Sequence, residues 1–179
     1  MVQATIENFG RIDFLVCNAG VWEGAPVEEM SEELWDRVIE INLKGTWTLC
    51  RAAVPHLKKQ RSGRVVIISS TAGQRGEAGY SNYAASKGGQ ISFTKSLAAE
   101  LGRFGITVNA LAPGWVDTNM SEDPLGQEME RDEIVRLIPL GRVATPVDIA
   151  GPILFLCSDW ARHITGEVLN VNGGSVLCG

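Results

Sequence analysis

A tyrosine and a lysine that stand four residues apart, Tyr83 and Lys87, are the residues of this sequence best suited to chemistry. On a helix, residues four apart lie one above the other on the same face, so the lysine ammonium would lie near the phenol oxygen. A neighbouring positive charge favours the phenolate and lowers the tyrosine pKa from its usual value of about 10. The pair could then exchange a proton near neutral pH. Tyr80 stands seven residues before Lys87 and has no such partner.

A serine is expected to join this pair. Ser70 closes an apolar run that ends in "IISS", thirteen residues before Tyr83. In a parallel sheet, the carboxyl end of a strand and the start of the next helix lie at the same edge, so Ser70 can face Tyr83 across a cleft. By itself the Tyr-x-x-x-Lys spacing is more often a pair on an exposed helix surface, and the interpretation therefore depends on the surrounding motifs.

Four short runs are apolar at nearly every position, which is typical of parallel strands covered on both faces. They are residues 12–17, 64–69, 106–111 and 167–171. Helical patterns separate them, and this alternation predicts an α/β fold with a mostly parallel sheet. Neither an internal repeat nor a linker is evident, so residues 1–179 are expected to form a single domain.

The helices have recognisable ends. A long helical stretch opens at Ser31, a good N-cap followed by acidic residues. A second helix is predicted over roughly residues 83–104, with Gly105 as its terminator. A third begins near Pro146, a residue suited to a first turn. Pro152, inside this third helix, is expected to bend it or to mark an early turn.

Composition excludes several classes of function. The 179 residues are 45% hydrophobic and 21% charged, with a net charge of −5, which argues against a nucleic-acid or anionic-membrane partner. The first residues lack the layout of a signal peptide, and the apolar runs are shorter than a membrane span requires. We therefore expect a soluble, cytoplasmic protein.

Neither the cysteines nor the histidines suggest a metal or hydrolase site. The four cysteines are scattered without a CxxC pair, which fits reduced thiols in a reducing compartment. They are Cys17, Cys50, Cys157 and Cys178. His56 and His163 are isolated, and no G-x-S-x-G pattern occurs, so neither metal binding nor a hydrolase is favoured.

Six motifs occur in a fixed order and carry a resemblance to a known family. They are "CNAG" at 17–20, "INLKGT" at 41–46, "ISS" at 68–70, "YAASK" at 83–87, "APGWVDT" at 112–118 and "ITGEVLNVNGG" at 164–174. Together they resemble the short-chain dehydrogenase/reductase family over essentially the whole chain. Within this family, the sequence is most similar to the 3-oxoacyl-(acyl carrier protein) reductase and glucose-dehydrogenase-like group. The resemblance implies a Rossmann-like, doubly wound sheet.

The resemblance also implies a reaction, the transfer of a hydride between NAD or NADP and a carbonyl or secondary alcohol. Tyr83 would be the general acid or base, and Lys87 would lower its pKa and bind the nicotinamide ribose. Ser70 would orient the substrate oxygen, and Asn42 would hold a water of a proton relay. Such donors suit the oxyanion character that appears when a hydride reaches a carbonyl carbon.

The cofactor positions implied by the resemblance fall into two groups. Asn18, Ala19 and Gly20 would lie near the adenosine end. Near the nicotinamide would lie Pro113, Gly114, Val116 and Thr118, together with Tyr83 and Lys87.

A substrate pocket is expected from two loops. Residues 74–82 include Tyr80, and residues 119–142 form a polar, acidic insertion between a strand and a helix. Insertions at strand ends often cover a ligand site. Trp22 and Trp115 could form apolar walls or belong to the core. The candidate cations for an acyl carrier or a phosphate are Arg75 and Arg142.

One family feature is not found. Family members begin with a strand and a glycine-rich turn that binds the pyrophosphate at a helix N-terminus. The glycines of residues 73–79 lack the required spacing, so roughly 70–80 residues, including the one that selects NAD or NADP, are expected to be absent. The strand at 12–17 would then be an exposed edge. A truncated gene model or a fragment of a longer reductase is the expected explanation.

Two hypotheses of different classes follow. The first is the oxidoreductase, acting on a small molecule as a homodimer or homotetramer. The alternative is a non-catalytic, truncated remnant that acts as a dimerisation or binding module. Binding of a nicotinamide nucleotide, and its loss in Lys87→Ala, would distinguish them.

Overall fold

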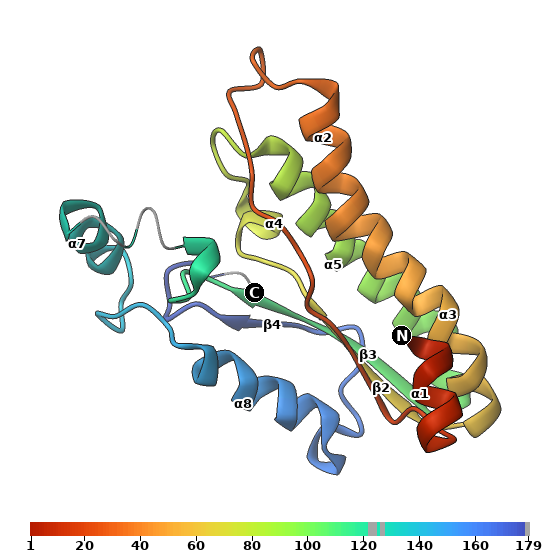
Figure 1. Ribbon diagram of the computed structural model, residues 1–179. Helices are drawn as coiled ribbons and strands as arrows, with labels where there is room; N and C mark the ends of the chain where they lie inside the picture. The colour runs from red at the N-terminus through yellow and green to blue at the C-terminus, as the bar shows by residue number, and fades with distance from the viewer. Residues whose placement is uncertain (122–124, 126–127, 178–179) are drawn as a thin grey trace.

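The chain folds around a four-stranded sheet whose neighbouring strands are all parallel. The computed structural model describes residues 1–121, 125 and 128–177. In spatial order the strands are β1 (Phe14–Cys17), β2 (Gly63–Ile68), β3 (Ile106–Pro113) and β4 (Val168–Val171). Each predicted strand is present, with ends that differ by one or two residues, and the predicted α/β class is confirmed (Figure 1).

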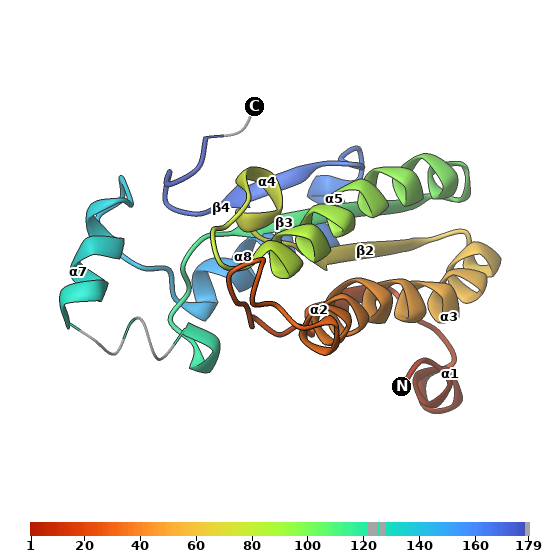
Figure 2. The same ribbon diagram turned by 90° about the horizontal axis from the view of Figure 1, so that it is seen from above.

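Helices cover both faces of the sheet. α3 (Gly45–Gln60) and α5 (Ser81–Leu101) lie over one face, and α8 (Pro146–Cys157) covers the other (Figure 1, Figure 2). The other helical segments are α1 (Val2–Phe9), α2 (Glu32–Ile39), the π-helical turn η1 (Glu40–Lys44), α4 (Ala72–Arg75), α7 (Glu128–Arg136) and the 3₁₀ turns η2 (Gly102–Phe104), η3 (Asn119–Ser121) and η4 (Asp159–Ala161). Within the described residues, none of these helices has the length and apolar character needed to cross a membrane.

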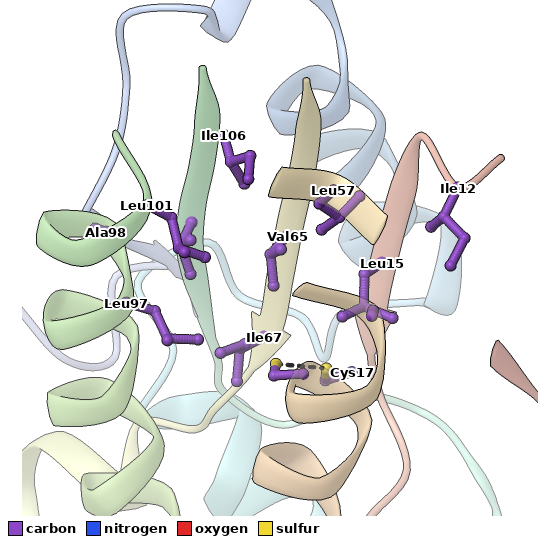
Figure 3. Packing of buried hydrophobic residues seen from close by; sticks show 13 residues of the cluster. Ile12, Leu15, Cys17, Leu57, Val65, Ile67, Leu97, Ala98, Leu101 and Ile106 are labelled. Atoms are coloured by element: carbon purple, nitrogen blue, oxygen red, sulfur yellow. Dashed lines mark hydrogen bonds between the residues drawn. The ribbon is translucent and has the colours of Figure 1, made fainter. Parts of the chain in front are cut away.

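β2 supplies the centre of two hydrophobic clusters, because successive side chains of a strand point to opposite faces. Val65 and Ile67 belong to the cluster formed with α3 and α5, which Figure 3 shows from close by. Val66 and Ile68 pack with α8 instead. This two-sided burial explains why β2 is apolar at every position except its start.

β1 departs from the expected burial on both faces. Leu15 and Cys17 are buried, but Phe14 is 56% and Val16 38% exposed. β1 pairs with β2 alone and is an edge strand of the described sheet. The exposed edge predicted for this strand is thus observed, and the predicted cover holds for one of its faces.

The helix ends follow the expected capping chemistry. Ser31 accepts a hydrogen bond from the Leu34 amide at 3.2 Å, at the start of α2. Gly105 has a φ of 72° after η2, in the left-handed region that favours glycine. At the start of α8, the Asp148 carboxylate accepts from both the amide and the hydroxyl of Thr145, at 2.7 and 2.8 Å.

Among the described residues, three α-helices were not predicted: α1, the single turn α4 and α7. α1 is short, and it contributes Val2 and Ile6 to the first core cluster. α7 lies in the polar insertion at 119–142, where few apolar positions mark a helical face. In contrast, α8 was predicted, and it continues past Pro152 to Cys157.

The cysteines behave as small hydrophobic side chains. The Cys17 and Cys50 sulfurs lie 3.9 Å apart in the core, and both thiols are free. Cys157 is also free, and Cys178 lies outside the described residues.

Replacing Leu101 by alanine should lower the free energy of unfolding by about 2–5 kcal/mol, because a cavity would remain between α5 and the sheet. Leu101 is fully buried, whereas Leu154 of α8 is 70% exposed. Leu154→Ala is therefore the matched control, with an expected loss below about 1 kcal/mol. Urea unfolding followed by circular dichroism measures both, and equal losses would contradict the packing described.

Candidate active site

The serine, tyrosine and lysine singled out by the sequence meet at the carboxyl end of β2. Ser70 follows this strand, and Tyr83 and Lys87 lie on the first turns of α5. The Ser70 hydroxyl interacts with the Tyr83 phenol and lowers its pKa. The Lys87 Nζ lies 5.6 Å from the centre of the Tyr83 ring, and both residues are buried. The structure therefore brings together the three residues that the spacing linked.

Lys87 is bound to the end of β2 at both its side chain and its backbone. The ammonium donates to the Ile68 carbonyl at 2.8 Å. The Ser69 hydroxyl donates to the Lys87 carbonyl, also at 2.8 Å. A Cβ at Gly73 would lie 2.5 Å from the Lys87 carbonyl carbon, so a glycine is needed for α4 to approach α5 this closely.

Burial shifts the two pKa values of this pair in opposite directions. Burial raises the pKa of Tyr83 to about 12. The Ser70 hydroxyl lowers this pKa, and the Glu77 charge raises it further. Burial also lowers the pKa of Lys87 to about 8. The structure thus differs from the prediction that Lys87 lowers the Tyr83 pKa. The reason is that loss of water disfavours both charged forms, while the ammonium is directed to the Ile68 carbonyl.

Asn42 lies in the π-helical turn η1, between α2 and α3. A π turn interrupts the regular helical hydrogen-bond ladder, and such turns are frequent at functional sites. The Asn42 carbonyl accepts from the Thr46 hydroxyl at 2.7 Å and from the Gln90 amide at 2.9 Å. Gln90 also donates to the Thr46 hydroxyl, at 2.7 Å. All three side chains are buried, so the turn is fixed by polar contacts inside the protein.

The side chain of Asn42 connects the turn after β1 to α5. Its amide accepts from the Val21 N–H at 2.8 Å and donates to the Val21 carbonyl at 2.9 Å. The same amide donates to the Ser86 hydroxyl at 3.1 Å. A Cβ at Gly20 would lie 3.1 Å from Asn42 Oδ1 and 3.5 Å from Lys87 Nζ. A side chain at position 20 would therefore fill the space next to these polar groups.

The loop after β3 begins beside the trio. The Pro113 carbonyl accepts from the Thr71 amide at 3.0 Å, directly after Ser70. A Cβ at Gly114 would lie 3.0 Å from the Asn172 Cβ, so this glycine permits a close approach to the segment after β4. Pro113 and Gly114 thus lie at the same edge of the sheet as Ser70.

Val116 and Thr118 lie farther along this loop. The Ser121 hydroxyl donates to the Val116 and Thr118 carbonyls and accepts from the Thr118 amide. In the described part of the chain, no hydrogen bond joins Val116 or Thr118 to Tyr83 or Lys87. Their part in nucleotide binding stays a prediction.

Three aromatic rings from three loops form an aromatic wall, defined here as Trp22, Tyr80 and Trp115. Trp22 stacks on Tyr80 with ring centres 4.5 Å apart, and Trp115 meets the Trp22 ring edge-on at 5.6 Å. Trp22 and Tyr80 also pack against the cluster that contains Tyr83. Burial raises the pKa of the half-buried Glu77 carboxyl, and the Trp22 indole opposes this rise. These residues are partly exposed beside the phenol, as expected of a pocket wall.

Comparison with known proteins decides the family. A family model described as enoyl-(acyl carrier protein) reductase matches residues 1–175. The 3-oxoacyl-[acyl-carrier-protein] reductase FabG of Thermotoga maritima is 44% identical over 177 residues, which are 99% of this chain and 71% of that protein. The chain belongs to the short-chain dehydrogenase/reductase family.

Other relatives agree with this assignment. FabG of Rickettsia felis is 45% identical over 167 residues, 93% of this chain and 68% of that protein. The crystal structure of a short-chain dehydrogenase/reductase (glucose/ribitol dehydrogenase) from Brucella melitensis is 40% identical and has a TM-score of 0.92. It is matched over 99% of this chain and 70% of its own. Membership confirms the predicted Rossmann-like fold and an oxidoreductase activity that depends on NAD or NADP.

The residues at the sheet edge of this short-chain dehydrogenase/reductase fit a nicotinamide nucleotide. Gly20 leaves the space beside Lys87 and Asn42 free of a side chain, and Asn18 and Ala19 next to it are exposed. Glycines at a turn that follows a strand allow a ligand to approach the backbone closely. Among the residues that the structure describes, no group of three or more His, Cys, Asp or Glu side chains could hold a metal ion.

Sequence reasoning missed the residues that support the predicted ones. Ser86 and Gln90 bind Asn42 from α5, and Ser69 and Gly73 fix the backbone at Lys87. A signal was available for the first two, since they stand four residues apart and thus share one helix face.

The difference in stability between the wild type and Lys87→Met should depend on pH. The Lys87 pKa falls from 10.5 to about 8 on folding, so between these values the unfolded chain binds more protons. The contribution of Lys87 to the free energy of unfolding therefore increases as the pH rises. From pH 7 to pH 10, the wild type should gain roughly 2 kcal/mol relative to Lys87→Met in urea unfolding. Lys95→Met, at an exposed position of α5, is the control, and a flat difference for Lys87→Met would contradict the burial described.

Proposed function

We propose that the chain interconverts an uncharged carbonyl compound and its secondary alcohol with NAD(H) or NADP(H), and that Ser70, Tyr83 and Lys87 act at the reacting oxygen. The observation that carries this proposal is the buried Tyr83 side chain, whose pKa the Ser70 hydroxyl lowers and whose ring centre lies 5.6 Å from the Lys87 ammonium. The nicotinamide supplies or accepts the hydride. The side chains must manage the proton and the charge on oxygen.

Tyr83 is the proposed general acid for reduction. With a pKa of about 12 it is a neutral phenol at pH 7 and holds the proton that the substrate oxygen needs. Ser70 is the second donor to this oxygen, and two such donors stabilise the negative charge that develops there. In alcohol oxidation the deprotonated form, the Tyr83 phenolate, accepts the proton of the alcohol and acts as the base.

Lys87 is proposed to return a proton to Tyr83 after reduction. Its pKa of about 8 lies close to neutral pH, the range in which a group exchanges protons most effectively. The ammonium lies 5.6 Å from the centre of the Tyr83 ring. Asn42 is proposed to line the proton route from Lys87, because both side chains approach the same point next to Gly20.

Two groups of residues are proposed to hold the nucleotide. On the side of β1 they are Asn18, Ala19 and Gly20, and on the side of β3 they are Pro113, Gly114, Val116 and Thr118, with Tyr83 and Lys87 between them. The Gly20 approach to Lys87 supports the first group, and the Pro113–Thr71 contact supports the second.

The aromatic wall is proposed to face the part of the substrate next to the carbonyl. Its flat apolar rings favour an uncharged group there, and the Glu77 carboxyl disfavours an anion. The names of the matched relatives suggest a 3-oxoacyl thioester or a small polyol ketone as first assays. Arg142 forms a two-point ion pair with Asp148 at 2.7 and 2.8 Å, so Arg75 is the better candidate for a carrier contact.

One observation favours the second candidate, a dimerisation module. Trp35 of α2 and Trp47 of α3 are 40% and 44% exposed, and rings of this size are common in protein interfaces. The two functions are compatible, and we propose that the chain assembles as a homo-oligomer. Titration of the purified chain with NADH and NADPH, compared with Lys87→Ala, separates an enzyme from a module that no longer binds nucleotide.

Tyr83→Phe should lower kcat for ketone or thioester reduction by about 10²–10⁴-fold, because it removes the proton donor and keeps the ring. The dissociation constant for NADH or NADPH should change less than about threefold. Tyr80→Phe, which keeps the stacked ring of the wall, is the control and should retain most of the activity. Equal activity of Tyr83→Phe and the wild type would exclude Tyr83 as the acid.

Glu77→Gln should shift the pH dependence of alcohol oxidation toward lower pH. The Glu77 charge raises the pKa of Tyr83, so removal of this charge lets the phenolate form at a lower pH. The expected shift is below about one pH unit. Glu28→Gln removes an exposed carboxylate from the loop between β1 and α2, and it should leave the pH profile unchanged. A shift of the Glu77→Gln profile toward higher pH would contradict the assignment.

A further inference from the structure

One buried polar contact of α5 has no part in the proposed chemistry. Gln90 lies one turn after Lys87, and its side chain is fully buried. Its amide nitrogen donates to the Asn42 carbonyl and to the Thr46 hydroxyl. Its amide oxygen is buried and has no hydrogen-bond partner among the described residues. A buried polar atom without a partner costs stability, so an apolar side chain would be the less costly choice unless the N–H donors are needed.

The contacts of Gln90 lead to the turn after β1. The Asn42 carbonyl, which Gln90 and Thr46 hold, lies in the π-helical turn η1. The side chain of the same Asn42 binds the Val21 N–H and carbonyl at 2.8 and 2.9 Å. Val21 directly follows Gly20, where a Cβ would lie 3.5 Å from Lys87 Nζ. A chain of short contacts therefore connects α5 with the proposed nucleotide turn.

We propose that Gln90 is a positioning residue, which fixes Asn42 and thereby holds the turn of Asn18, Ala19 and Gly20 at a set distance from Lys87. Ser86 takes part from the same helix face, since it accepts from the Asn42 amide. The helix that carries Tyr83 and Lys87 thus also sets the place of the turn on the opposite side of the site. The importance of that turn for nucleotide binding rests on the proposed function, whereas the positioning itself does not.

Asn42 needs contacts at both its backbone carbonyl and its side chain if it is to stay in one position. An Asn side chain can rotate, and a π turn departs from the regular α-helical hydrogen-bond pattern. Gln90 and Thr46 bind the carbonyl, while Val21 and Ser86 bind the amide, so the residue is held at both ends. Loss of the Gln90 donors would remove the contact between α5 and the buried Asn42 carbonyl and allow the turn to shift.

The first test measures the Val21 amide and needs no nucleotide. Gln90→Met keeps the volume of the side chain and removes both donors. We expect hydrogen exchange at the Val21 N–H, measured by NMR, to accelerate at least tenfold. Thr94→Val is the control, because Thr94 is also fully buried on α5 but donates only to the Gln90 carbonyl, at 2.8 Å. Thr94→Val should lower the stability of the protein without accelerating exchange at the Val21 N–H relative to the amides of the sheet.

The second test measures nucleotide affinity. By tryptophan fluorescence, Gln90→Met should bind NADH and NADPH about tenfold more weakly than the wild type, and Thr94→Val within about twofold. Gln90→Glu should bind weakly at pH 8 and recover on acidification, because a buried carboxyl becomes neutral and can again donate one hydrogen bond. Gln90→Met should show no such recovery.

The outcomes separate this inference from the proposed function. Unchanged Val21 exchange in Gln90→Met would overturn the positioning role, as would equal acceleration in Thr94→Val. Two results can also occur together: exchange at Val21 is faster in Gln90→Met, and the wild-type chain binds no nucleotide. This combination would support the positioning role and reject the proposed function. If Gln90→Met does not fold, Gln90→Glu decides through the same Val21 signal, which must be slower at acid pH than its intrinsic pH dependence predicts.

Discussion

The arrangement of the site depends on keeping the Lys87 ammonium out of water. A buried cation is costly unless hydrogen bonds replace its hydration, and the Ile68 carbonyl at the end of β2 provides one. This contact draws the start of α5 onto the sheet edge, and the Ser69 hydroxyl fixes the helix backbone at the same residue. The approach is so close that position 73 must be a glycine. Tyr83, four residues earlier on the same helix face, then lies near the end of β2, where it packs with Val38 and Ala72.

The parallel sheet brings the loops after β1 and β3 next to the residues at the end of β2. Because the carboxyl ends of parallel strands meet at one edge, the segments after β1, β2 and β3 lie side by side although they are far apart in sequence. Gly20, Ser70 and Pro113 reach the site in this way. The two-sided burial of β2 makes the edge rigid, since α3 and α5 press on one face and α8 on the other. The loops can therefore carry chemistry while the strands keep their places.

The features that follow from periodicity could be predicted from the sequence. Four strands, three helices and the meeting of Tyr83, Lys87 and Ser70 depend on helix and strand repeats and on the sheet edge, and the structure contains all of them. The π turn at Asn42 could not be predicted, because the contacts that hold it come from Gln90, 48 residues away. The pKa of Tyr83 was predicted in the wrong direction for a similar reason. Spacing reveals a neighbouring charge, but the loss of water depends on the whole fold.

The opposite pKa shifts determine which group carries the mobile proton. With values of about 12 for Tyr83 and about 8 for Lys87, the difference of about four corresponds to roughly 5 kcal/mol in favour of the proton on the phenol. A phenolate left after substrate protonation would therefore take a proton from the ammonium spontaneously. In the proposed reaction, Lys87 and not Tyr83 then exchanges protons with its surroundings near neutral pH. A site of this kind needs a fixed environment on the far side of the lysine, and there Gly20 and the doubly held Asn42 lie.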